Sequence, residues 1–438
     1  MMRSFMIRNL SVFPVAMMLL FGFACAPSSM PIREEMPGAR RSGWTVKFDG
    51  SASSPVVASG VLYVGSKGGG VYAFDPTSGG IKWHFQTGNA VEATPAVEGG
   101  TVFIGSNDSS LYAIDALSGK KKWSFQTGGA ITLSSIVEDG IVYTISRDGL
   151  HAIDAITGQE RWAFAILLRP SIRRPIIGNR IVYLTAERHL YAIDAESGLA
   201  KWTLTVDEEN ISAPAVAHGL VFFSAYTTRF EQKDRELVYI KSLTKLYAVN
   251  AASGKMKWEF RAEVEDPRGF GQPPIAVNDT VYFASAAGLF AIDLNTGNKR
   301  WSFSAKRIST DFQVDDRFVY IVTNKGSFVT PSDTLHALDA STGQEQWSFD
   351  IGGFFGKRQM SIKGIHGGVL YATGEQYLHA IDTATGKKLW SFKTETRMES
   401  HPLVFEGMTY TTSVTKEHYP PGQGYLYAID AKTGKLRP

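Results

Sequence analysis

The sequence predicts an all-β protein, a β-propeller built from four-stranded antiparallel blades. Three observations predict this fold: a unit of about 40 residues recurs along the chain, each unit holds four short strand-like runs, and the two ends of the repeat region complement each other. Units of this kind arranged around an axis form a propeller. Nine copies of the unit predict nine blades.

The repeated unit is clearest over residues 111–123, with the sequence LYAIDALSGKKKW. Asp115 and Ser118 are residue types that accept hydrogen bonds within a turn, and Gly119 supplies the positive φ that a tight hairpin requires. We expect the Trp that follows to fill a slot against the next sheet, a packing role with no catalytic part. The Trp residues of this class are Trp44, Trp83, Trp123, Trp162, Trp202, Trp258, Trp301, Trp347 and Trp390.

The strand-like runs of each unit are short and rich in β-branched and aromatic residues, with Gly, Asn, Asp and Ser between them. In the second unit they cover residues 94–97, 101–105, 111–115 and 122–126. After residue 44 no stretch keeps the apolar spacing of an amphipathic helix. Every blade is therefore expected to hold four strands and no helix.

Closure of the ring is predicted from the two ends of the repeat region. The last unit stops at Pro438, where its Trp would fall, and an isolated Trp strand, residues 44–48, precedes the first unit. Pairing that strand with the last unit leaves no free sheet edge, which removes a site of aggregation. We therefore expect the Trp44 strand to complete the last blade.

Composition and charge exclude several classes of function. A net charge of +3, from 45 Lys and Arg against 42 Asp and Glu, gives no basic excess of the kind a nucleic-acid-binding protein shows. A single Cys excludes an internal disulfide or a thiolate metal cage. His151, His336 and His379 stand where other units carry Tyr, so we interpret them as packing residues. We expect no catalytic, cofactor-binding or metal-binding residues.

The amino terminus predicts a secreted, lipid-anchored protein. Arg3 and Arg8 precede an apolar run over residues 10–23 that is shorter than the roughly 20 residues needed to span a bilayer, the layout of a secretory signal. We expect residues 1–24 to be a lipoprotein-type signal peptide and Cys25 to be lipidated, with a secreted protein carrying a spare Cys as the alternative. Residues 25–43 then form the anchor and a flexible tether, and residues 44–438 the propeller.

Over residues 44–438 the repeat resembles that of the PQQ-type β-propeller family, in particular the BamB-like outer-membrane assembly lipoproteins. Members of that branch usually have eight blades, which makes eight the alternative to nine. The resemblance implies a non-catalytic protein-interaction scaffold on the periplasmic side of the bacterial envelope, anchored in the outer membrane by lipid alone. Its partner would be an envelope protein, with the outer-membrane assembly machinery as the candidate.

A second branch of the family implies a different function. Quinoprotein dehydrogenases bind pyrroloquinoline quinone and Ca²⁺ beside a disulfide of adjacent cysteines, whereas this chain has only Cys25. The alternative functions are therefore a periplasmic quinoprotein oxidoreductase and a propeller that binds a small ligand or a polysaccharide. The repeat itself is a packing motif and does not establish the cofactor.

Departures from the repeat predict where a partner binds. The insertions at residues 225–245, 324–334 and 414–424, and the lengthened connections at 261–273 and 350–364, all belong to the same face of the ring. Arg and aromatic residues are frequent anchors of protein interfaces, although they could equally be loop packing and solvated charge. The candidate residues are Leu168, Arg169, Arg173, Arg174, Arg229, Arg235, Phe354, Phe355 and Arg358.

Overall fold

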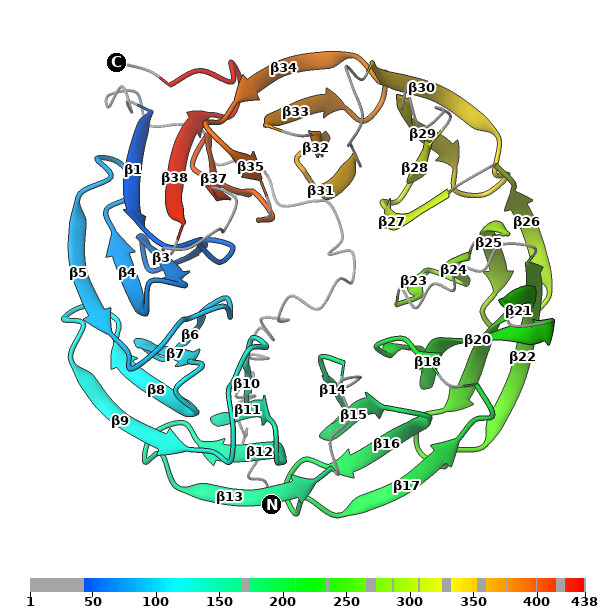
Figure 1. The fold of residues 1–438 in the computed structure, drawn as a ribbon, viewed down its shortest axis with the longest axis horizontal. Helices are drawn as coiled ribbons and strands as arrows, with labels where there is room; N and C mark the ends of the chain where they lie inside the picture. Colours follow the sequence, from blue (N-terminus) through cyan, green and yellow to red (C-terminus); the bar gives the residue numbers. More distant parts are fainter. Residues whose placement is uncertain are drawn as a thin grey trace, which may run out of the picture.

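A computed structural model describes residues 43–166, 173–208, 210–233, 236–264, 273–285, 287–305, 308–324, 332–352, 360–374, 376–398, 400–414 and 422–436. Within these ranges all regular structure is β, and the strands form nine antiparallel sheets arranged as blades around a ring (Figure 1). None of the described segments forms a helix long and apolar enough to cross a membrane. The prediction of nine blades is confirmed.

The first four blades each contain four strands, numbered from the centre of the ring outward. Blade 1 contains β2 (Val56–Ala58), β3 (Val61–Ser66), β4 (Gly70–Phe74) and β5 (Ile81–Gln86). Blade 2 contains β6 (Ala96–Glu98), β7 (Thr101–Gly105), β8 (Ser110–Asp115) and β9 (Lys121–Gln126). Blade 3 contains β10 (Ile136–Glu138), β11 (Ile141–Ser146), β12 (Gly149–Asp154) and β13 (Glu160–Ala165). Blade 4 contains β14 (Ile176–Gly178), β15 (Ile181–Ala186), β16 (His189–Asp194) and β17 (Ala200–Thr205).

Blade 5 differs from its neighbours in having two short inner strands and three long ones. It contains β18 (Asn210–Ile211), β19 (Ala215–Ala217), β20 (Leu220–Lys233), β21 (Glu236–Asn250) and β22 (Met256–Val264). Blade 6 contains β23 (Ile275–Val277), β24 (Thr280–Ser285), β25 (Gly288–Asp293) and β26 (Lys299–Phe303). Blade 7 contains β27 (Ile308–Val314), β28 (Phe318–Asn324), β29 (Ser332–Asp339) and β30 (Glu345–Gly352).

The last two blades complete the ring. Blade 8 contains β31 (Ser361–His366), β32 (Val369–Gly374), β33 (Tyr377–Asp382) and β34 (Lys388–Lys393). Blade 9 contains β35 (Arg397–Met398), β36 (Leu403–Phe405), β37 (Met408–Val414) and β38 (Gln423–Asp430), and its outermost strand is β1 (Trp44–Asp49).

Each blade has two distinct ends, which blade 3 illustrates. Strands β11 and β12 are joined beside Ser146 and Gly149, and the outer strand β13 ends there, because Ala165 pairs with Gly149. The Asp154–Gly158 turn lies at the opposite end. We call the end with the Asp–Gly turn the turn face and the other end the loop face. Each strand-2–3 connection and each passage to the next blade lies on the loop face.

The Asp–Gly turn is fixed by hydrogen bonds that all nine blades share. In blade 2 the amide and hydroxyl of Ser118 both donate to Asp115 Oδ1, at 2.9 and 2.8 Å. These hydrogen bonds, that of the Ser118 amide more than that of its hydroxyl, lower the pKa of Asp115 below its usual range. Gly119 adopts φ +71°, as the sequence predicted. The turn is therefore a rigid unit whose geometry the sequence fixes locally.

Each turn holds the Trp of the preceding blade. Trp83 of blade 1 donates from Nε1 to the Ala116 carbonyl oxygen of blade 2 at 3.0 Å, and its ring lies against Gly119, where a Cβ would come within 2.7 Å of it. We call this arrangement the Trp clasp. The nine donor–acceptor pairs are Trp44–Pro76, Trp83–Ala116, Trp123–Ala155, Trp162–Ala195, Trp202–Ala251, Trp258–Leu294, Trp301–Ala340, Trp347–Thr383 and Trp390–Ala431.

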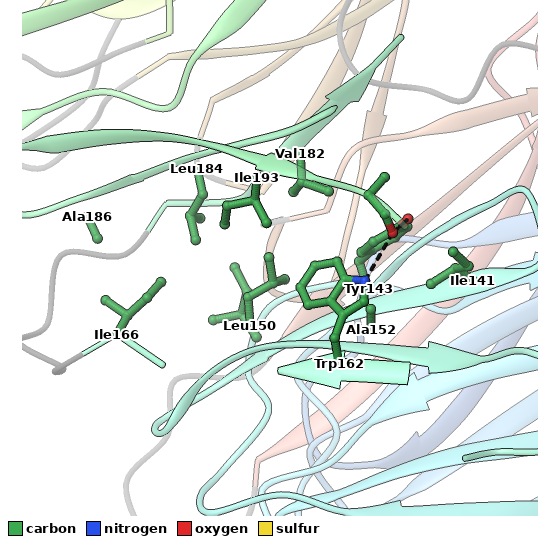
Figure 2. Packing of buried hydrophobic residues seen from close by; sticks show 12 residues of the cluster. Ile141, Tyr143, Leu150, Ala152, Trp162, Ile166, Val182, Leu184, Ala186 and Ile193 are labelled. Carbon is green, nitrogen blue, oxygen red and sulfur yellow. Dashed lines mark hydrogen bonds between the residues drawn. The ribbon is translucent and has the colours of Figure 1, made fainter. Parts of the chain in front are cut away.

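The hydrophobic core is distributed between neighbouring blades. Figure 2 shows the cluster between blades 3 and 4, in which Trp162 and Leu150 face Val182 and Ile193. The small Ala152, fully buried, pairs across the blade with Trp162. This alternation of small and large side chains lets adjacent sheets pack closely, and it makes each interface depend on a Trp from one blade and a turn from the next.

The Trp44 strand closes the ring as predicted. Strand β1 pairs antiparallel with β38 from Trp44–Ala428 to Asp49–Gln423. Trp44 Nε1 and Tyr410 Oη of blade 9 both donate to the Pro76 carbonyl oxygen of blade 1, at 3.1 and 2.9 Å. Figure 1 shows β1 between β38 and the strands of blade 1. The two ends of the chain are thus joined in one sheet.

The Trp clasp predicts the effect of adding a methyl group to its glycine. Gly119→Ala places a Cβ against the Trp83 ring and should lower the free energy of unfolding by about 1–3 kcal/mol more than backbone strain alone. Gly60→Ala is the matched control, since Gly60 has the same φ of +71° and no atom within 4 Å of an added Cβ. Chemical denaturation measures the free energy of unfolding of both variants. If both substitutions lowered it equally, the clasp would not be tightly packed.

Candidate functional site: the loop face and the central channel

The largest departure from the repeat is a hairpin that projects from blade 5. Strands β20 and β21 have 14 and 15 residues, whereas the equivalent β15 and β16 have 6 each. Their pairing continues to Lys233–Glu236 on the loop face. The hairpin lies at residues 225–245, where the sequence predicted an insertion.

The outer part of this hairpin has free edges. Strand β18 reaches along β20 only to Tyr226, and β22 reaches along β21 only to Ser242. In the part of the chain that the structure describes, residues 229–233 and 236–241 therefore pair only with each other. Such edges carry unpaired backbone N–H and C=O groups, which are a template for another strand. The loop face thus offers a backbone surface for a partner.

Two of the predicted interface residues precede the innermost strand of blade 4. Arg173 and Arg174 are exposed and directly precede the innermost strand of blade 4, and the Arg173 amide donates to the Thr185 carbonyl oxygen at 3.1 Å. Burial by surrounding protein lowers the pKa of Arg174 below its ordinary value. Both arginines therefore lie at the inner edge of blade 4, on its loop face.

The other predicted residues are not brought together with these two by the described structure. Arg229 lies on β20 in the projecting hairpin, for which only the backbone is described. The remaining predictions lie outside the described residues; they are Leu168, Arg169, Arg235, Phe354, Phe355, Arg358 and Cys25. The partner-binding set therefore stays a prediction.

The innermost strands of blades 7–9 carry a polar cluster that the sequence analysis missed. Ser361 Oγ donates to Asp311 Oδ2 at 2.7 Å. Burial is the largest cause of the lowered pKa of His401. The positive charge of Lys363 lowers this pKa further, whereas the negative charge of Asp311 raises it. The innermost position in the repeat, just before or within the first strand, is the only sequence signal that could have located these residues. Polar groups of blades 7, 8 and 9 thus lie near one another at the inner edge of the sheets.

The repeat-position histidines are packing residues, as predicted. His151, His336 and His379 each contact the Phe of the preceding blade, at centroid distances of 5.8, 5.4 and 6.5 Å. The Phe85–Tyr112 and Phe164–Tyr191 pairs occupy the same place in other blades. The imidazoles also bond locally; His379 Nδ1 lies 2.8 Å from Ser391 Oγ. Their ring packing matches that of the Tyr they replace, and His151 and His336 each pair in addition with a glutamate of the outer strand, Glu160 and Glu345.

A quinone–calcium site was tested against the donor groups of the protein. Ca²⁺ takes six to eight oxygen ligands, mainly from carboxylates and carbonyls. Over the described ranges, no three His, Cys, Asp or Glu side chains are placed together to hold a metal ion.

Comparison with known families decides the identity of the fold. The sequence profile of the family described as "Outer membrane protein assembly factor BamB" matches residues 37–177, 146–334 and 331–437. The chain belongs to this family. The propeller with its nine Trp clasps is accordingly a member of the BamB-like group, with one blade more than the eight expected from the resemblance. No curated protein matches the chain.

Solved structures share the fold at low identity. BamB from Moraxella catarrhalis is 14% identical, with a TM-score of 0.52, covering 88% of this chain and 100% of that one. Quinohemoprotein alcohol dehydrogenase ADHIIG from Pseudomonas putida HK5 is 17% identical, with a TM-score of 0.53, covering 90% and 77%. The computationally designed Ika8 protein is 15% identical, with a TM-score of 0.53, covering 78% and 97%. These similarities concern the fold alone.

Burial of His379 predicts a pH-dependent contribution to stability. Burial, assisted by the charge of Lys388, lowers the pKa of His379 to about 4. Because an unfolded His titrates near 6.5, acid protonates the unfolded chain first, and the free energy of unfolding should fall by up to about 3 kcal/mol between pH 7 and 4. His379→Phe introduces the residue type that blade 6 carries at the same position, Phe290, and should remove this part of the slope. Chemical denaturation of the wild type and of His379→Phe at each pH measures this. If the free energy of unfolding of both proteins fell equally between pH 7 and 4, the assignment would be contradicted.

Proposed function

We propose that the protein is an envelope lipoprotein that acts as a non-catalytic protein-interaction scaffold in outer-membrane protein assembly. The observation that carries the proposal is the asymmetry of the ring: nine uniform clasps on the turn face, and the lengthened segments on the loop face. Membership of the BamB-like family supports it. Uniform turns serve closure, which leaves the loop face for recognition.

Two features of the loop face suit a protein partner. The free edges of the β20–β21 hairpin can accept a strand by backbone hydrogen bonding, a recurrent mode of peptide recognition. Arg173 and Arg174 add exposed guanidinium groups, which donate to carboxylates in a fixed geometry. A partner with an extended segment and acidic side chains would match both features.

The anchor places this scaffold at a membrane. In the proposal residues 1–24 are removed as a signal peptide, Cys25 carries the lipid and residues 25–43 form the tether, so the propeller stands on the periplasmic side of the outer membrane. The eighteen residues 26–43 reach roughly 60 Å when extended. The membrane is contacted through this lipid anchor, and no nucleic acid is bound.

A periplasmic quinoprotein oxidoreductase is the alternative, supported by the fold likeness to a quinohemoprotein alcohol dehydrogenase. The family model that matches the chain is that of the BamB assembly factor, which makes the scaffold the better-supported function. Quinone absorbance in the purified protein, or Ca²⁺-dependent reduction of a dye, would contradict the scaffold proposal.

The scaffold proposal predicts that the loop-face arginines contribute to partner capture. Arg173→Ala combined with Arg174→Ala should reduce recovery of an outer-membrane partner from detergent-solubilised envelopes by about tenfold or more, since truncation of an interface hot spot costs that much. Arg180→Ala is the matched control. Arg180 belongs to the same blade, lies on the turn face and pairs there with Glu196.

The decisive comparison is between the double variant and this control at equal expression and equal thermal stability. Recovery that falls in the double variant alone supports the loop-face assignment. Unchanged recovery in the double variant, or an equal loss in both, would refute it.

A further inference from the structure

The turn face, although uniform in its backbone, carries an unusual set of exposed apolar side chains. Among the described residues, the exposed large aliphatic side chains all lie at the turn end of their blades, whereas the remaining exposed large hydrophobic, Tyr377, lies at the loop end. The aliphatic residues are Ile81, Leu117, Ile156, Leu199, Met256, Leu389 and Leu436. Turns normally carry polar residues, so the exposed aliphatic side chains at these turns require an explanation.

The most exposed of these side chains lie on consecutive blades. Leu117, Ile156 and Leu199, on blades 2, 3 and 4, are 80%, 86% and 71% exposed, and Ile81 on blade 1 is 55% exposed. We call these four residues the apolar arc. Their blades follow one another around the ring (Figure 1). The turn position of Leu117 and Ile156 holds Asn295 in blade 6 and Ser341 in blade 7. The less exposed Met256, Leu389 and Leu436 lie on blades 5, 8 and 9, so among the described residues the exposed aliphatic side chains occur on every blade except 6 and 7.

The chain enters the ring on this same face and beside this arc. Trp44 pairs with Ala428, two residues before the last Asp–Gly turn begins, and it is held by the turn of blade 1. Strand β1 then runs away from the turn face toward Gln423. The segment that precedes Trp44, which carries Cys25, therefore joins the propeller at the turn face, where the arc begins.

We propose that the apolar arc is a membrane-docking surface that rests on the lipid bilayer to which Cys25 is anchored; this rests on the lipoprotein assignment proposed above. Isolated apolar side chains at an interface insert among lipid headgroups and acyl chain ends, and flanking lysines extend to anionic headgroups. Lys120 and Lys121 are exposed beside Leu117. The bilayer is thus the partner whose chemistry matches both residue types.

Docking through the turn face orients the scaffold. Because the loop face is the opposite end of every blade, the projecting hairpin and Arg174 would point away from the membrane toward the periplasm. A lipid anchor on a flexible tether cannot set this orientation alone. The apolar arc supplies the second contact that fixes which face the partner meets.

The test measures the lipid exposure of a single turn in the anchored protein. The full lipidated chain carrying Leu117→Cys is labelled with the dye NBD and reconstituted into vesicles of phosphatidylethanolamine and phosphatidylglycerol. The matched control is Ser341→Cys, at the same turn position in blade 7. Reduction of the dye by dithionite should be about tenfold slower at position 117 in vesicles than in detergent, because the inserted side chain leaves water, and unchanged at position 341.

Each other outcome overturns the inference. Equal rates at both positions would show that the arc does not touch lipid, and protection at position 117 in detergent would show that protein covers it, either the tether or a second copy. A chain that fails to float with the vesicles would refute the anchor itself. Partner capture by the loop-face arginines is measured separately, so failure of docking and failure of the scaffold role are distinguishable.

Discussion

The structure depends on one repeated interaction, the insertion of a Trp side chain into the Asp–Gly turn of the following blade. The indole N–H donates to a turn carbonyl oxygen, and the ring occupies the space that the glycine leaves by lacking a Cβ. The contact links each blade to the next one around the ring, from Trp83 in the turn of blade 2 to Trp44 in the turn of blade 1. Stability in such arrays is a sum of contacts between neighbouring blades. The contact made by Trp44 joins the last blade to the first and therefore closes the ring.

This constraint fixes the backbone of the turn face and leaves the length of the loop-face connections free to vary. The turn face must keep its spacing in all nine blades, since any change in length would displace a Trp. The loop face carries no clasp, and there the chain can lengthen, as β20 and β21 do. A scaffold built in this way can gain a binding surface without loss of its core, and the exposed aliphatic side chains show that the turn face can still vary in side chains at fixed backbone.

The fold was predictable from the sequence because its determinants are local. Asp115, Ser118 and Gly119 lie within five residues of one another, and their nine copies give the blade number directly. Residues that act together across blades were not predictable in this way. Asp311, Lys363 and His401 belong to three different blades, and the apolar arc exists only because four turns share one face. Arg174 was singled out as a loop residue, but its position at the inner edge of the ring depends on where the innermost strand of blade 4 begins.

The central claim is that the Trp clasp joins the chain ends into a closed ring, and a double-mutant cycle across the closure tests it most directly. Gly79→Ala would place a Cβ about 2.5 Å from the Trp44 ring. When Trp44→Ala removes that ring, the destabilisation caused by Gly79→Ala should decrease by about 1–3 kcal/mol. Additive effects of the two substitutions would mean that Trp44 does not lie in the turn of blade 1, and the account of ring closure would be wrong.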